Sequence, residues 1–276
     1  MTDEAVGVLH GVGSLTCTHA DSIYQPDASG IYSEFTANTP VIRGGIFTGG
    51  VWTLPAGAFF ISQPAMENSQ IRSNDQTNAE WTTSALSAAQ NITGIRDDAN
   101  GACALTASGA NATCIANAIT AASDTHCTRW WLKRGSGSGG VDLTLNGGST
   151  WNSVTITNDW AEYLIEQAAL TNPQIGIRLQ TNGDVVHVGN AECHLTKGTK
   201  NVQGSGPIFT AGTSDTTAAT VYSISAQNHS EASGVWLATF FLEHFISGQG
   251  YLGEVGVLWF NQAGSSGGRM LGAKYL

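Results

Sequence analysis

Short stretches that alternate between apolar and polar side chains, separated by turn signals, run through most of this chain of 276 residues. Residues 141–145 alternate cleanly, as a strand with one buried face does, and Asn146-Gly147-Gly148 follows as a tight turn. Such turns recur every ~8–12 residues, the spacing that sandwiches and barrels show. The pattern predicts an all-β fold, a jelly-roll β-sandwich with β-rich N- and C-terminal docking segments.

The central part of the chain carries the clearest strand signals. Strands are predicted at 59–61, 126–134, 141–145, 153–157, 162–165, 174–181 and 185–188. In the second of these, Trp130 and Leu132 are expected on one face of the strand. Trp131 and Lys133 are then expected on the opposite face.

Connections between these strands are predicted from Gly, Pro, Asn and Asp. Residues 135–140 are Gly-rich and indicate a hairpin-type connection, and Asn182-Gly183-Asp184 indicates a strong turn. The motif Pro26-Asp27-x-x-Gly30 predicts a further turn, because Pro presets φ and Gly accepts a positive φ. The Ala-rich residues 85–89 are compatible with a helical turn or a loop.

Three segments follow from these signals. We expect an N-terminal β and loop docking segment at 1–57, a jelly-roll domain at 58–198, and a C-terminal β-rich segment at 199–276. A linker-like stretch at 197–207 marks the second boundary. A segment of about 75 residues is marginal as an independent domain. It therefore either packs with the N-terminal segment or completes its core in an oligomer.

The low and acidic charge of the chain limits the classes of partner that it can bind. Only 12% of residues are charged, the net charge is −10, and the 11 Lys and Arg form no cluster. A nucleic-acid partner needs clustered cations and is not expected. No apolar run reaches the ~18 residues that span a membrane, and the N-terminus is acidic where a secretory leader is basic. We expect assembly in a cytoplasm without a membrane partner.

Three sequence blocks carry a resemblance to a known domain. They comprise 59–68 with Ser73 and Asn78-Ala79-Glu80-Trp81; 130–135; and 148–151 with Trp160, 172–177, 183–188 and 191–192. These blocks resemble a domain of tail-fibre and minor structural proteins of tailed bacteriophages, which looks like a carbohydrate-binding-module jelly roll. The stretch before them is similar to the leader of such proteins, but has His19 where an Arg is usual and a displaced Arg43.

The resemblance implies a non-enzymatic structural protein of the virion, a fibre, decoration or cement subunit of capsid or tail. Its expected partners are other phage virion proteins and host surface polysaccharide. The apolar run 235–241 is typical of an interface, so we expect a homo-oligomer, with a trimer favoured by analogy with phage fibres. A stand-alone carbohydrate-binding adhesion module is the alternative. A glycan-cleaving tailspike-type enzyme is less favoured, because no known catalytic motif is present.

Three tryptophans are candidates for glycan contact, namely Trp131, Trp151 and Trp160. They lie in or beside predicted strands among Asn, Thr and Gln. Sugar rings stack their C–H faces on flat aromatic rings while polar neighbours bind the hydroxyls. The competing interpretation is that these tryptophans are core or interface anchors.

One structural calcium ion is the only cofactor that the resemblance implies. Asp97 and Asp98 offer oxygen ligands in one loop, and Asp184 and Glu192 offer more near a strand. A solvated Asx turn is the competing interpretation of the loop. The five cysteines match no disulfide framework and are expected to be free and buried.

Overall fold

The computed structural model describes the chain in blocks. They are residues 14–18, 20–27, 30–38, 42–43, 46–48, 51–53, 59–62, 66–195, 197–199, 202, 206–217, 221–225, 236–246, 249–250, 254–260 and 269–275. Every element with assigned bounds is a β-strand. Within these blocks, no helix has the length and apolar character needed to cross a membrane. The predicted all-β class is confirmed.

The chain divides into two compact units. Residues 66–216 form one unit, and residues 1–65 with 217–276 form the other. Strand β7 (Phe59–Ser62), expected at the start of the jelly roll, belongs to the second unit, where it pairs with β21 (Trp236–Ile246). The domain limits at 57/58 and 198/199 stay predictions.

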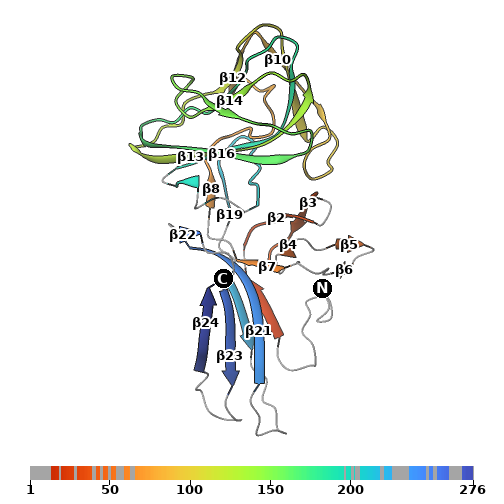
Figure 1. The fold of residues 1–276 in the computed structure, drawn as a ribbon, viewed down its shortest axis with the longest axis vertical. Helices are drawn as coiled ribbons and strands as arrows, with labels where there is room; N and C mark the ends of the chain where they lie inside the picture. Colours follow the sequence, from red (N-terminus) through yellow and green to blue (C-terminus); the bar gives the residue numbers. More distant parts are fainter. Residues whose placement is uncertain are drawn as a thin grey trace. The chain divides into compact units, whose positions relative to one another are not determined.

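Residues 66–216 fold into a sandwich of two five-stranded antiparallel sheets (Figure 1). One, the β13 sheet, has the order β10 (Leu86–Ile92), β11 (Ala102–Ala107), β18 (Val185–His194), β13 (Asp124–Ser136), β16 (Ala161–Leu170). The other, the β14 sheet, has the order β15 (Asn152–Val154), β14 (Val141–Thr144), β17 (Gly176–Leu179), β12 (Ala112–Ala116), β9 (Trp81–Ser84). Because the chain crosses repeatedly between the sheets, most neighbours within a sheet are distant in sequence, as in a jelly roll.

Two local expectations are corrected by this topology. Residues 85–89 are not a helical turn: Ala85 has φ 49°, and β10 starts at Leu86, opposite Ala107 of β11. Pairing with β11 and burial of Leu86 outweigh the helix propensity of the alanines. Residues 137–140 do not close a hairpin, because they carry the chain from β13 to β14 in the other sheet.

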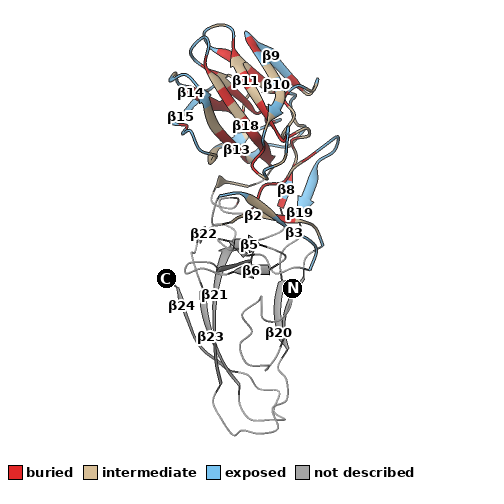
Figure 2. Ribbon diagram, turned by 90° about the vertical axis from the view of Figure 1, so that its right-hand side faces the viewer, coloured by how far each residue is buried: buried red, intermediate tan, exposed pale blue. Residues whose placement is uncertain are grey.

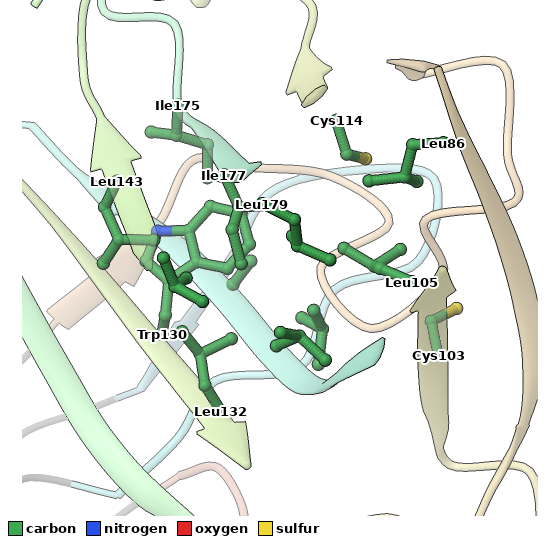
Figure 3. Close-up of a cluster of buried hydrophobic side chains, with 14 of the residues drawn as sticks. Leu86, Cys103, Leu105, Cys114, Trp130, Leu132, Leu143, Ile175, Ile177 and Leu179 are labelled. Atoms are coloured by element: carbon green, nitrogen blue, oxygen red, sulfur yellow. The ribbon is translucent and has the colours of Figure 1, made fainter. Parts of the chain in front are cut away.

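The core lies between the two sheets and is built from one face of each strand (Figure 2). Trp130 is fully buried there and meets Trp81 edge to face, with ring centroids 5.8 Å apart. Figure 3 shows Trp130 and Leu132 among Leu143 and Ile177 of the opposite sheet. The predicted inward face of β13 is therefore confirmed.

The described cysteine side chains are free and buried, as expected. They are Cys103, Cys114, Cys127 and Cys193. Burial raises the pKa of Cys103 to about 11 and that of Cys114 and Cys193 to about 12. These thiols therefore stay protonated at neutral pH and act as small apolar side chains.

A second, smaller apolar cluster lies on the outer face of the β13 sheet. Met66, Cys127, Val202 and Ile208 are buried together, with Leu164 packed against them. The described residues of the stretch expected to be a linker thus pack against the sandwich. Part of that outer face is closed to solvent as a result.

A charged network fastens this covering stretch. The fully buried Arg129 guanidinium donates to Glu192 Oε2 at 2.7 Å, and to the carbonyl oxygens of Val202 and Gly206 at 2.8 Å each. Glu192 Oε1 accepts from the Ile208 N–H at 2.6 Å. The network therefore satisfies the buried charges and holds the covering chain through its backbone.

The His194 ring also belongs to this network. Its Nδ1 lies 2.7 Å from the Glu67 carbonyl oxygen, and its Nε2 lies 2.7 Å from Glu192 Oε2. Burial alone raises the pKa of Glu192, but Arg129, His194 and the Ile208 N–H outweigh it and hold that pKa below its ordinary value.

The remaining strands are described mainly by their backbone pairing. A larger sheet has the order β24 (Arg269–Tyr275), β23 (Glu254–Phe260), β21, β7, β4 (Ile42–Arg43), with β22 (Gln249–Gly250) beside β21. Four two-stranded pairs are β1 (Ser14–Thr18) with β20 (Val221–Ser225), β2 (Ile23–Pro26) with β3 (Tyr32–Phe35), β5 (Ile46–Thr48) with β6 (Val51–Thr53), and β8 (Met66–Asn68) with β19 (Asp215–Thr217).

Two expectations about the termini meet different outcomes. The predicted turn between β2 and β3 is confirmed, because Gly30 has φ 82° and its N–H donates to the Asp27 carbonyl oxygen at 3.1 Å. The apolar run 235–241 falls largely on β21, whose side chains lie outside the described residues. The oligomer that this run suggests stays a prediction.

The buried network generates a stability prediction. Glu192→Ala leaves the Arg129 guanidinium in a dry site without its carboxylate, so we expect a loss of about 3–5 kcal/mol in the free energy of unfolding. Urea denaturation of the full chain, followed by tryptophan fluorescence, measures it. The exposed carboxylate variant Glu166→Ala is the control, with a loss of about 1 kcal/mol or less.

A double variant separates buried charge from simple loss of volume. Arg129→Met with Glu192→Leu replaces the pair by apolar side chains of similar size. We expect this double variant to be more stable than Glu192→Ala, because no charge is stranded. A double variant as unstable as the single one would contradict this explanation.

Candidate functional site

The three candidate tryptophans lie in three different settings. Trp131 points to the outer side of the β13 sheet, but only 1% of it is exposed, and the Arg129 guanidinium carbon lies 4.5 Å from its ring centroid. Trp131 is therefore an anchor beneath the buried network and is closed to a glycan. Trp151 and Trp160 are half-buried and lie on the outer faces of opposite sheets. The three do not form one glycan-binding surface.

Trp151 borders a continuous row of outward side chains on the β14 sheet. Cross-strand register aligns Ser153, Asp142, Arg178, Thr113 and Ser84 on β15, β14, β17, β12 and β9. The neighbours of Asp142, Arg178 and Thr113 along their strands fill the core, so alternation turns these three outward. Ser153 and Ser84 pair with Asp142 and Thr113 and so lie on the same face. Four steps between strands of about 4.8 Å each make the row roughly 19 Å long. We name this row, with Trp151 and Gln180, the Trp151 face.

Asp142 organises the polar half of the Trp151 face. Its Oδ2 accepts from Arg178 Nε at 2.9 Å, and its Oδ1 accepts from Ser153 Oγ at 2.6 Å. Gln180 Nε2 bridges both carboxylate oxygens, at 3.1 and 2.9 Å. Burial works to raise the pKa of Asp142, but the hydrogen bonds from Ser153, Gln180 and Arg178 hold it below its ordinary value. Asp142 is therefore a charged positioning group.

Arg178 joins the polar row to the aromatic ring. Its guanidinium carbon lies 4.7 Å from the Trp151 ring centroid, a cation–π distance. About a quarter of the Arg178 side chain (26%) stays exposed, whereas Asp142 is buried. A guanidinium has five N–H donors, and those that Asp142 does not take are held in a fixed direction beside the indole.

A short loop fixes Trp151. Thr144 Oγ1 accepts from the N–H groups of Asn146 and Gly148, at 3.2 and 3.1 Å. Asn146 Oδ1 in turn accepts from the Thr150 N–H at 2.8 Å. Gly148 has φ 89°, and a Cβ there would lie 3.0 Å from the indole, so only glycine allows this packing. The predicted turn thus presents Trp151 rigidly at the sheet edge.

The four candidate calcium ligands are not brought together. Asp97 and Asp98 lie between β10 and β11, and Asp98 pairs with Arg96 at 2.7 Å. Asp184 lies just before β18 and pairs with Arg134 at 3.4 Å, while Glu192 belongs to the buried network. Asp184 and Glu192 are separated by most of a ten-residue strand. Among the described residues, no three His, Cys, Asp or Glu gather as a metal site, and these four do not fit one ion.

Sequence reasoning missed the partners of Trp151. Asp142, Arg178 and Gln180 stand on β14 and at the end of β17, which are separated by more than 30 residues. One signal was available, since Asp142 is the polar member of the alternating stretch 141–145. The register that places Arg178 beside Asp142 comes only from the folded sheet.

No family model and no curated protein matches this chain. Solved structures with a similar fold include a family 29 carbohydrate-binding module, with 12% identity and TM-score 0.36 over 48% of this chain and 89% of that one. Another is the C-terminal family 6 module of LamC, a laminarinase of Zobellia galactanivorans, with 9% identity and TM-score 0.32 over 47% and 98%.

A third is the enzymatically active domain of tailspike protein 4 of bacteriophage CBA120, with 12% identity and TM-score 0.34 over 46% of this chain and 21% of that one. At these identities and TM-scores, the likenesses carry no argument about the ligand or activity of this chain.

Two depressed carboxyl pKa values predict acid sensitivity. Asp142 and Glu192 have lower pKa values in the folded than in the unfolded chain. Their stabilisation is therefore complete above the ordinary carboxyl range of about pH 4–4.5 and is lost as the pH falls through the lower folded values. We expect the melting temperature to decrease as the pH is lowered below that range, and to decrease less steeply for the Asp142→Asn variant. The exposed Asp159→Asn is the control and keeps the parent's slope; parallel curves for all three would contradict the assignment.

Proposed function

We propose that the sandwich is a non-catalytic carbohydrate-binding module that holds a glycan chain along the Trp151 face, within a structural subunit of a tailed-phage particle. One observation carries the binding part of this proposal. A half-exposed indole, held rigidly by its loop, borders a row of ordered polar side chains on an open sheet face.

The chemistry of the face suits a neutral sugar. The apolar C–H face of a sugar ring stacks on an indole, while hydroxyl groups need both donors and acceptors close by. Arg178 supplies N–H donors, and the exposed Gln180 keeps its carbonyl oxygen as an acceptor because its Nε2 is bound to Asp142. Thr113 and Ser84 extend the row with hydroxyl groups. Since hydrogen bonds already fix Asp142, little conformational entropy is lost at this side chain when a ligand binds.

The state of Asp142 argues against hydrolysis on this face. A glycosidase acid needs a carboxyl with a raised pKa beside the scissile bond. Asp142 instead has a lowered pKa, and its oxygens accept from three side chains. The same bonds suit a residue that orients Arg178 and Gln180. This arrangement supports a binding role without catalysis on this face.

The particle setting rests on the sequence. The blocks at 130–135 and 148–151 resemble a domain of phage tail-fibre and minor structural proteins. A weakly charged chain with few Lys and Arg suits a subunit that stacks against neighbours. In this proposal the sandwich faces the host surface, and the second unit attaches it to the particle as part of a homo-oligomer.

Removal of the indole tests the binding site. We expect Trp151→Ala to weaken binding of the neutral glycans that the parent retains on an array by about tenfold or more. Trp160→Ala, which removes an indole from the opposite sheet, is the matched control and keeps the parent's neutral-glycan binding. Near-ultraviolet circular dichroism checks that both variants fold. A parent that retains no neutral glycan, or a Trp151→Ala variant that binds like the parent, would overturn the proposal.

Purified particles of a phage that encodes this chain test the particle setting. We expect mass spectrometry to detect the chain, in high copy number for a capsid decoration and in few copies for a tail component. Native mass spectrometry is expected to show an oligomer, with a trimer favoured. If the chain is absent from the particles, the stand-alone binding module replaces the virion subunit.

A further inference from the structure

A second aromatic surface lies on the outer face of the β13 sheet. Trp160 precedes β16, and its ring lies over Gly189, where a Cβ would come within 3.2 Å of the indole. The pairing of β13 with β18 shifts register at this point, since Trp131 is opposite Asn190 but Leu132 is opposite Val188. Gly189 is the extra residue of a β-bulge, and its lack of a side chain leaves room for the indole.

Lys133 holds its charge over this ring. Its Nζ lies 4.9 Å from the Trp160 ring centroid. Four described arginines of the sandwich form ion pairs with carboxylates. They are Arg96, Arg129, Arg134 and Arg178. Within the described part of the chain, by contrast, no carboxylate forms an ion pair with Lys133. An aromatic ring compensates an ammonium only in part, so positive potential remains at this point of an acidic protein.

His187 stands directly across the strand pair from Lys133. Its ring centroid lies 6.5 Å from that of Trp160, and its buried Nδ1 has no hydrogen-bond partner in the described structure. Burial, and then the charge of Lys133, lower the pKa of His187, so the ring is neutral at neutral pH. On the far side of His187, β11 presents only Ala104.

From this geometry we propose that Trp160, Lys133 and His187 form a second ligand site, which takes an acidic sugar bearing a carboxylate or a sulfate ester. The sugar ring stacks on the exposed part of the Trp160 indole and its anionic group pairs with the Lys133 ammonium, beside the neutral His187 ring. A single compact ammonium suits one negative charge. The site lies on the sheet opposite the Trp151 face and does not depend on it.

Paired glycans test this site with the full chain. Polygalacturonate, alginate and hyaluronan are compared with their carboxyl-reduced forms, and carrageenan with its desulfated form, by affinity electrophoresis. We expect the Trp151→Ala variant, which lacks the indole of the Trp151 face, to retain at least one acidic glycan and to bind its neutral counterpart at least about tenfold more weakly. Binding is also expected to fall at high salt, because exposed charges are screened. The carboxylate and sulfate arms decide which anion is recognised.

Variants assign the binding to the three side chains. We expect Trp160→Ala and Lys133→Gln to lose acidic-glycan retention, Lys133→Arg to keep most of it, and Trp151→Ala to leave it unchanged. The proposal is overturned if the parent retains none of the acidic glycans, if Trp151→Ala binds the neutral counterparts equally well, or if Lys133→Gln binds like the parent. If neutral-glycan binding at Trp151 is not observed, the test of the acidic-sugar site is unaffected, because it is read from acidic glycans and from Lys133 variants.

Discussion

Side-chain alternation along β13 determines how the rest of the sandwich is used. Trp130 and Leu132 point into the core, where Trp130 packs against Trp81 between the two sheets. Arg129, Trp131 and Lys133 must then point outward, because a strand repeats every two residues. As a result, the outer side of β13 carries in succession a buried guanidinium, a buried indole and a half-buried ammonium.

The outer face of the β13 sheet has two different fates. Around Arg129, the carbonyl oxygens of Val202 and Gly206 and the Glu192 carboxylate enclose the guanidinium, since a buried charge is stable only when it is paired and hydrogen-bonded. That enclosure also buries Trp131. Further along the same face, no described segment closes over Lys133 and Trp160 to the same extent, and both stay half-buried. The β14 sheet carries its polar row across all five strands. Each of the two outer faces presents an indole with a cation above it.

Local patterns predict part of this arrangement. The strand at 126–134, its inward face and the turn before Trp151 follow from alternation and from turn residues, and the structure confirms them. Ala85 and the alanines after it were interpreted wrongly, because pairing with β11 is decided by residues outside the local stretch. The burial of Trp131 depends on a covering segment some 70 residues away, and the link between Asp142 and Arg178 depends on strand register. Neither can be derived from local propensity. The separation of the four carboxylates expected to bind calcium has the same origin.

Glycan binding on the Trp151 face depends on contact with the Trp151 indole. The most direct measurement follows the indole N–H resonances of the eight tryptophans in a ¹H–¹⁵N correlation spectrum during titration with a neutral glycan that the chain retains. We expect the Trp151 resonance, assigned from the Trp151→Phe spectrum, to shift progressively, while the resonances of the buried Trp130 and Trp131 stay in place. A titration that leaves Trp151 unmoved while the glycan binds would contradict it.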